Sequence, residues 1–175
     1  MYFKRFIELF PDLAEKETRR ITIRNDKRVP DGEYAFLDAY CADKTCDCRR
    51  VYFYVLQIDQ KFESIHAATI SYGWEDLEFY ESWSPYLPPD MAKEMKGPIL
   101  ERSVEQSQYA EHFLLLFKTV MLNDPDYIER IKRHYTLFKI KLGGKAFKKK
   151  LFKGYDKYAP CPCGSGKKLK FCCLK

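Results

Sequence analysis

Seven cysteines are the residues whose type and spacing most directly indicate chemistry in this chain of 175 residues. The first cluster comprises Cys41, Cys46 and Cys48. The C-terminal cluster comprises Cys161, Cys163, Cys172 and Cys173. Thiolates that lie close together bind metal ions or carry out redox chemistry. In a reducing compartment such clusters bind metal more often than they form disulfides. The two clusters therefore predict metal binding.

The C-terminal cluster has the spacing C-x-C, eight residues, then C-C. Four thiolates that meet in this way satisfy a tetrahedral Zn²⁺ ion and leave no open position, which is the pattern of a structural site. Pro162 stiffens the first pair, and Gly164 and Gly166 permit a tight turn beneath the metal. A segment this short buries little apolar surface, so metal binding must supply most of its folding free energy.

This segment closely resembles the SEC-C motif, the zinc-binding C-terminal tail of the Sec translocase motor ATPase. The resemblance is carried by residues 161–168 together with Lys170, Cys172 and Cys173. It implies zinc as the cofactor and a protein-interaction role, because the family's knuckle contacts an export chaperone or the ribosome. It does not imply the motor's ATPase activity. Cys161 stands where a Walker A loop requires Gly, and Lys168 stands where it requires Ser or Thr.

The first cluster, with the spacing C-x4-C-x-C, admits three interpretations. Its thiolates could form a second metal site. Alternatively, Cys46 or Cys48 could be a redox or nucleophilic thiolate, since the adjacent Arg49 and Arg50 would lower a thiol pKa. The cysteines could also be buried without a chemical role. This cysteine-rich loop before an Arg-Arg strand resembles a loop of uncharacterised bacterial proteins that also end in SEC-C. The resemblance implies no activity.

A second metal site would need a fourth ligand in addition to the three thiolates. Asp43, Asp47 or water are the nearest candidates. His66 is a poor candidate because, in the expected hairpin, it faces about Val55, seven residues from Cys48. At roughly 3.3 Å per residue, that separation is about 23 Å.

The rest of the sequence predicts an α+β fold, in which a small antiparallel sheet packs with C-terminal helices and ends in a zinc knuckle. Strands are predicted over residues 21–23, 33–40, 51–58 and 63–72, the last two paired through a turn near residues 59–61. Helices are predicted over residues 2–10, 103–122 and 126–141. Asp124 and Pro125 suit the start of the last helix, and Gly143-Gly144 suits its end. Residues 73–89 are expected to be irregular.

Three regions follow from this pattern. They are an α+β body of unassigned family (residues 1–143), a basic aromatic connector (144–158) and the SEC-C-like knuckle (159–175). Residues 138–175 hold 12 lysines and one acidic residue and carry a charge of +11, so the remainder carries −5. Aromatic residues interleave with lysines in the connector, as nucleic-acid stacking and phosphate contacts require. These are Phe147, Phe152, Tyr155 and Tyr158 with Lys148, Lys149, Lys150, Lys153 and Lys157.

Several functional classes are not indicated. The chain has no HExxH, GxSxG or dinucleotide-binding pattern, so an enzyme is the less favoured class. Its longest strongly apolar run, residues 113–117, is too short to cross a bilayer. Charges within residues 1–10 do not suit a secretory signal, so a cytoplasmic location is expected.

The leading functional prediction is a cytoplasmic zinc-binding protein that interacts with a protein partner through its C-terminal knuckle. One alternative is nucleic-acid or ribosome binding through the basic tail, with RNA or DNA as the partner. A second alternative is a thiol-dependent enzyme that uses Cys46 or Cys48.

Overall fold

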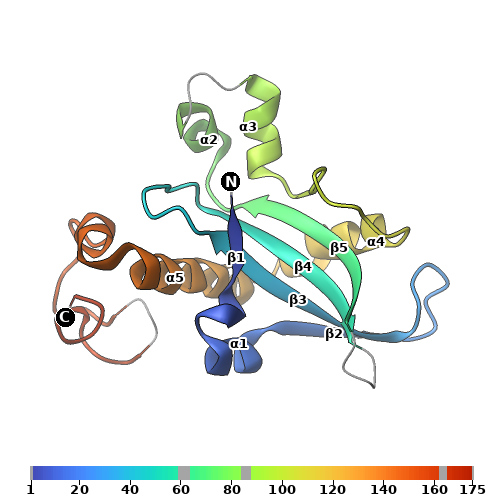
Figure 1. Ribbon diagram of the computed structural model, residues 1–175, viewed down its shortest axis with the longest axis horizontal. Helices are drawn as coiled ribbons and strands as arrows, with labels where there is room; N and C mark the ends of the chain where they lie inside the picture. The colour runs from blue at the N-terminus through green and yellow to red at the C-terminus, as the bar shows by residue number, and fades with distance from the viewer. Residues whose placement is uncertain (1, 59–63, 84–87, 162–164, 175) are drawn as a thin grey trace.

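The computed structural model describes residues 2–58, 64–83, 88–161 and 165–174, without the side chains of residues 83, 89 and 144–151. These residues form one sheet of six strands in which every pairing is antiparallel. The strands are β1 (Phe3–Arg5), β2 (Arg19–Ile23), β3 (Gly32–Cys41), β4 (Arg50–Ile58), β5 (Ser64–Gly73) and β6 (Ile99–Leu100). Their order is β1-β3-β4-β5-β6, and β2 pairs with the other half of the β3 edge that β1 occupies (Figure 1).

Helices accompany the sheet, so the predicted α+β class is confirmed. The α-helices are α1 (Pro11–Glu17), α2 (Leu77–Trp83), α3 (Pro89–Lys96), α4 (Ala110–Leu116) and α5 (Pro125–Leu151). Three short segments are the 3₁₀ helices η1 (Phe6–Glu8) and η3 (Leu169–Phe171) and the π-helical η2 (Phe117–Met121). None of the helices in the described part of the chain is both long and apolar enough to span a membrane.

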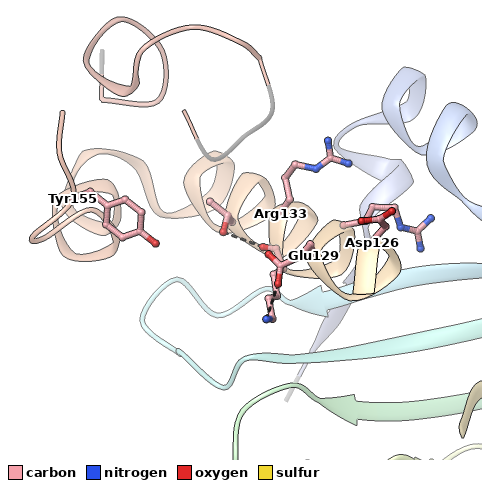
Figure 2. Close-up of a pocket in the computed structure, with 7 residues that line it drawn as sticks. Asp126, Glu129, Arg133 and Tyr155 are labelled. Atoms are coloured by element: carbon pink, nitrogen blue, oxygen red, sulfur yellow. Dashed lines mark hydrogen bonds and ion pairs between the residues drawn. The ribbon is translucent and has the colours of Figure 1, made fainter. Parts of the chain in front are cut away.

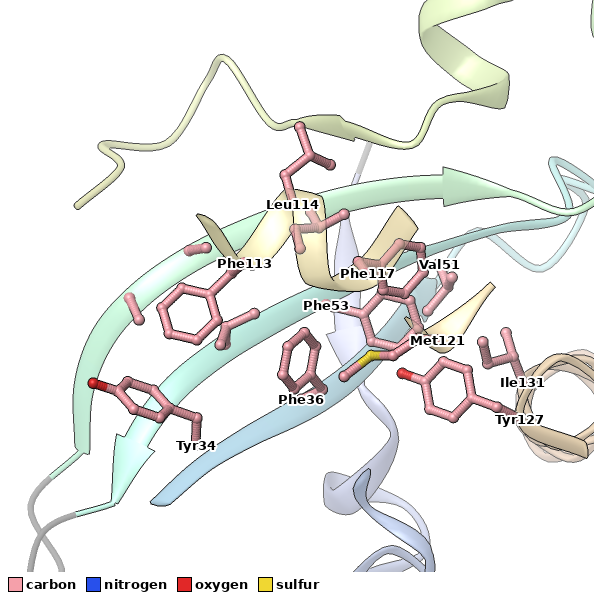
Figure 3. Packing of buried hydrophobic residues seen from close by; sticks show 14 of the residues in the cluster. Tyr34, Phe36, Val51, Phe53, Phe113, Leu114, Phe117, Met121, Tyr127 and Ile131 are labelled. Atoms are coloured by element: carbon pink, nitrogen blue, oxygen red, sulfur yellow. The ribbon is translucent and has the colours of Figure 1, made fainter. Parts of the chain in front are cut away.

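The core lies between one face of the sheet and the helices α4, η2 and α5 (Figure 3). Side chains alternate across a strand, so Tyr34, Phe36 and Tyr40 of β3 all point to this face. Phe53 of β4 is fully buried beside them, and its ring centroid lies 5.1 Å from that of Phe117. These rings give β3 and β4 a fixed position under the helices.

The four predicted strands all form, and β4 pairs antiparallel with β5 as expected. The turn predicted near residues 59–61 lies outside the described residues. The helix predicted over residues 2–10 is wrong, because this stretch forms β1 and η1. A helix, α1, instead begins at Pro11, since the fixed φ of proline and its missing N–H suit the first helical position.

Residues 73–89, expected to be irregular, contain α2, and α3 follows without having been predicted. The carboxylate of Asp76 accepts a hydrogen bond from the Phe79 amide (2.8 Å), which caps the first turn of α2. The helix predicted over residues 103–122 begins only at Ala110. Before this helix, the side-chain amide of Gln106 accepts a hydrogen bond from the backbone N–H of Thr69 and donates one to its C=O. These two bonds take the place of a neighbouring strand at this edge of β5.

The last helix begins as predicted, with the Asp124 carboxylate accepting from the Tyr127 amide (3.1 Å). Its predicted end at Gly143-Gly144 is wrong, because α5 continues to Leu151. Glycine inside a helix costs only about 1 kcal/mol relative to alanine, and it ends a helix where it adopts a positive φ. That conformation occurs at Gly154, where φ is 86°. The helix therefore crosses from the predicted body into the predicted connector.

A buried ionic network joins α5 to the sheet. The Nδ1 of His134 lies 2.7 Å from the Asp38 carboxylate, and its Nε2 lies 2.8 Å from that of Glu17. His134 is fully buried and Asp38 is nearly so. The ring of Phe6 stacks on the imidazole with centroids 4.0 Å apart, while Arg133 also pairs with Glu17. Both ring nitrogens thus lie within hydrogen-bond distance of a carboxylate, so the imidazole links α5 to β3 and to α1.

We predict that His134→Ala lowers the free energy of unfolding by about 1–3 kcal/mol, since it removes a hydrogen-bond partner of the buried Asp38 carboxylate and the ring that stacks on Phe6. Urea denaturation measures the change. The matched control is Glu33→Gln, which breaks the exposed Arg20–Glu33 pair (3.0 Å) and should change stability by less than about 1 kcal/mol. Equal effects of the two substitutions would contradict the assigned role of the network.

Candidate metal centres

The first cysteine cluster lies where β3 ends and the chain turns back into β4. Cys41 is the last residue of β3, and Cys46 and Cys48 belong to the loop that follows. The three sulfur atoms lie within 4.8 Å of one another. Cys41 and Cys48 are fully buried, whereas Cys46 is partly exposed. Sulfurs gathered at this spacing could hold a metal ion such as zinc.

Helix α5 holds this loop in place from one side. The ammonium of Lys139 donates to the carbonyl oxygens of Asp43 and Cys46, each at 2.8 Å. The hydroxyl of Tyr135 donates to the carboxylate of Asp47 (2.9 Å). Because these contacts fix the backbone on both sides of Cys46, the thiols are positioned by the fold as well as by one another.

The other side of the loop is held by α2 and the segment that leads into it. Arg49 has a φ of 47°, which turns the chain sharply into β4. Its carbonyl accepts a hydrogen bond from Tyr80 (2.9 Å), and its guanidinium pairs with Glu75 (3.0 Å) and lies 4.7 Å from the ring centroid of Phe79. The arginine expected to lower a thiol pKa thus has carboxylate and aromatic partners of its own.

The three thiols share hydrogen bonds that shift their ionisation unequally. Hydrogen bonds from Cys46 and then Cys48 lower the pKa of Cys41, with a smaller contribution from the charge of Lys139. The hydrogen bond to Cys41 raises the pKa of Cys46 and also that of Cys48, to which burial adds. The three thiols are therefore unequal in acidity, and a metal ion would bind them as thiolates.

The expected fourth ligand is not found at the first cluster. Among the described residues, no histidine, aspartate or glutamate side chain joins the three sulfurs in one group. Asp43 instead accepts from the backbone and hydroxyl of Thr45, both at 2.8 Å. Asp47 bonds Tyr135 and Arg49. His66 pairs with Leu56, far along β4 from the cluster, and bonds Thr69, so its exclusion agrees with the structure.

The C-terminal cluster also gathers its sulfurs. Those of Cys161, Cys172 and Cys173 lie within 4.8 Å of one another, and Cys163 lies outside the described residues. The amide of Cys161 donates to the carbonyl of Lys167 (2.7 Å), which closes the loop that carries the cluster. These three thiolates fit the donor set of a structural zinc site.

The same segment has a small apolar core of its own. Leu169 is fully buried and packs with Phe152 and the cysteines, and Ile140 of α5 closes one side. The sequence did not indicate this packing. Phe152, expected to stack on bases, is buried. The C-terminal knuckle (residues 159–175) thus packs against Ile140 of α5 and against Phe152, which follows the end of that helix.

The outer surface of the knuckle carries aromatic rings and lysines. Phe171 is 60% exposed and Tyr158 is 46% exposed. The ammonium of Lys170 lies 5.3 Å from the ring centroid of Tyr158 and 5.6 Å from that of Phe171, and Lys157 also lies 5.3 Å from the Tyr158 centroid. This arrangement places an apolar centre within a cationic border.

Residues 159–175 match the SEC-C motif. The match covers the whole knuckle and leaves residues 1–158 unassigned. No curated protein and no solved structure matches the chain. The SEC-C segment therefore connects the chain to zinc binding, and only in general terms to protein interaction, while the body stands on its own geometry.

A pocket of about 510 Å³ lies between α5 and Tyr155 (Figure 2). The sequence did not indicate it. It is lined by Asp126, Glu129, Arg130, Lys132, Arg133, Thr136 and Tyr155. Glu129 pairs with Lys132 (2.8 Å), and Arg133 pairs with Glu17. Because its charges are of both signs, the pocket does not indicate a particular ligand.

We predict that removing metal with a chelator unfolds the SEC-C segment while the sheet persists. The amides of Cys161 and Leu169, which donate to Lys167 and Ala159, should lose protection from hydrogen exchange. The amide of Phe53 in the centre of the sheet serves as the internal control. Persistent protection of Leu169 in metal-free protein would show that its small core folds without metal.

Proposed function

We propose that this chain is a cytoplasmic zinc-binding protein that uses its SEC-C segment to bind a protein partner. Cys161, Cys163, Cys172 and Cys173 would hold the zinc. The observation that carries the proposal is the gathered triad of Cys161, Cys172 and Cys173 within a segment that matches SEC-C. By resemblance, the partner would be a chaperone or a ribosome-associated protein.

The partner surface we propose is centred on Phe171, beside Tyr158 and the partly exposed Leu174. Exposed aromatic side chains on a rigid support provide most of the binding free energy in many interfaces. Leu169, the other large apolar residue among these lysines, is buried inside the knuckle and would support the surface without touching a partner. The lysines at its border favour a partner whose apolar pocket has an acidic rim.

We predict that Phe171→Ala weakens partner binding tenfold or more, with little dependence on salt, because the lost contribution is burial of an aromatic ring. The full chain and its variants are immobilised, and the proteins that each one retains after nuclease treatment are compared by mass spectrometry. The control is Tyr2→Ala, which removes a comparably exposed ring (68%) at the other end of the chain. Identical retention by the wild type and the Phe171→Ala variant would refute this surface.

A second candidate function is nucleic-acid or ribosome binding through the basic tail. Its specific support is the pairing of lysines with the exposed Tyr158 ring, which combines a stacking surface with phosphate-binding groups. The side chains of Phe147, Lys148, Lys149 and Lys150 lie outside the described residues. Lys153, Lys167 and Lys168 are exposed and can be tested directly.

If RNA is the partner, its binding constant should fall linearly with salt on a double-logarithmic scale. Replacing Lys153, Lys167 and Lys168 with Gln should then reduce the slope by about one unit for each lost phosphate contact. A matched control replaces three exposed lysines of the body, Lys16, Lys27 and Lys118. Fluorescence anisotropy with a labelled single-stranded RNA measures both slopes. Equal slopes in the two triple variants would exclude the tail as the RNA site.

The thiol-dependent enzyme is the least supported alternative. Cys48 is fully buried, and hydrogen bonding and burial raise its pKa, whereas a nucleophilic cysteine needs access and a lowered pKa. Cys46 is partly exposed, but its pKa is raised as well. The lowered pKa belongs to Cys41, which is buried. The thiol with the lowered pKa, Cys41, is therefore not the thiol that is partly exposed to solvent, Cys46.

A further inference from the structure

The side chain of Lys139 places an ammonium group in the interior of the protein. It is fully buried, and its ammonium donates to two backbone carbonyls in the loop of the first cysteine cluster. In the described part of the chain, no carboxylate lies within ion-pair distance of this ammonium. A buried cation is costly unless a negative group nearby compensates it. The loop must therefore supply a negative charge that is not a carboxylate.

The thiolates of the first cluster can supply it. Three thiolates around one divalent ion carry a net charge of about −1, which a single ammonium neutralises. The carbonyls of Asp43 and of Cys46 itself bind Lys139, so the ammonium is held directly behind the loop that carries the sulfurs. We infer that Cys41, Cys46 and Cys48 form a second metal site for a thiophilic divalent ion of the zinc class. Lys139 is its built-in counter-charge.

The coordination of this site is incomplete within the described protein. No fourth histidine, aspartate or glutamate among the described residues joins the sulfurs, and tetrahedral zinc takes four ligands. Cys46 is the partly exposed member, so the approach from solvent is on its side. The fourth position is therefore taken by an exchangeable ligand from solution, of the class of water or a small thiol. This distinguishes the site from the closed one proposed for the C-terminal cluster.

This inference goes beyond the proposed function and does not rest on it, because no residue of the SEC-C segment takes part. The first test is native mass spectrometry of the intact chain, which should show about two zinc ions per molecule. Cys172→Ser combined with Cys173→Ser should leave about one, and adding Cys46→Ser should leave none. A folded double variant that binds no zinc would overturn the second site. If the wild type and the double variant each bind one zinc ion, the C-terminal cluster holds none, and that outcome would bear only on the proposed function.

The role of Lys139 has its own test in the same double variant. Lys139→Met keeps the length of the side chain and removes the charge, and it should weaken zinc retention against a competing chelator by about ten- to a hundredfold. Lys141→Met, two residues along α5 and exposed, is the matched control and should leave retention unchanged. Circular dichroism confirms that both variants fold. Equal retention in the two variants would remove Lys139 from the site.

Cobalt in place of zinc tests the fourth position. In the Cys172→Ser, Cys173→Ser variant, adding 2-mercaptoethanol should shift the cobalt absorption bands, since a thiolate would replace water. In the Cys46→Ser variant, only the C-terminal site should hold cobalt, and its spectrum should not change. An unchanged spectrum in the first case would mean that the coordination is already complete, which would overturn the open position.

Discussion

The contact of His134 with the buried Asp38 and the half-buried Glu17 is the constraint on which the rest of the molecule depends. It joins α5 to β3 through Asp38 and to the end of α1 through Glu17. A displacement of α5 would break both contacts and remove a hydrogen-bond partner from the buried Asp38 carboxylate, a loss of about 1–3 kcal/mol. Together with the packed aromatic core, this network holds the helix against the sheet. It therefore fixes both the rotation and the position of α5.

That position decides what the following turn of α5 can reach. Lys139 points to the loop of the first cysteine cluster, while the next residue, Ile140, packs against the core of the knuckle. Adjacent residues of a helix point about 100° apart, so one turn can serve two neighbours on different sides. Both cysteine clusters are attached to the same stretch of helix. The network at His134 thus positions each of them without contacting either.

Local patterns in the sequence predicted what depends on neighbouring residues. The spacing predicts the ligand set proposed for the C-terminal cluster, and the structure gathers the sulfurs of Cys161, Cys172 and Cys173. The strands β4 and β5 follow from their β-branched and aromatic composition, and β3 from its aromatic residues. The contact of Lys139 with Asp43 spans 96 residues of sequence, so no local pattern could reveal it. Gln106 was assigned to a helix because its role as a substitute strand depends on Thr69 of β5. Gly143-Gly144 misled for a similar reason, since glycine ends a helix only where the chain turns away.

The two cysteine clusters also differ in what makes them form. The first lies between β3 and β4, whose pairing runs from Glu33 to Tyr40 and does not involve the thiols, so the fold brings the sulfurs together in advance of any metal. The second lies in a short segment whose core has few apolar side chains, so a metal would have to contribute much of its folding free energy. A site that is arranged in advance can leave a coordination position open without unfolding. A site that folds only with its metal needs all of its ligands. Exposed side chains of the same segment, such as Phe171, can then contact a partner but do not contact the ion.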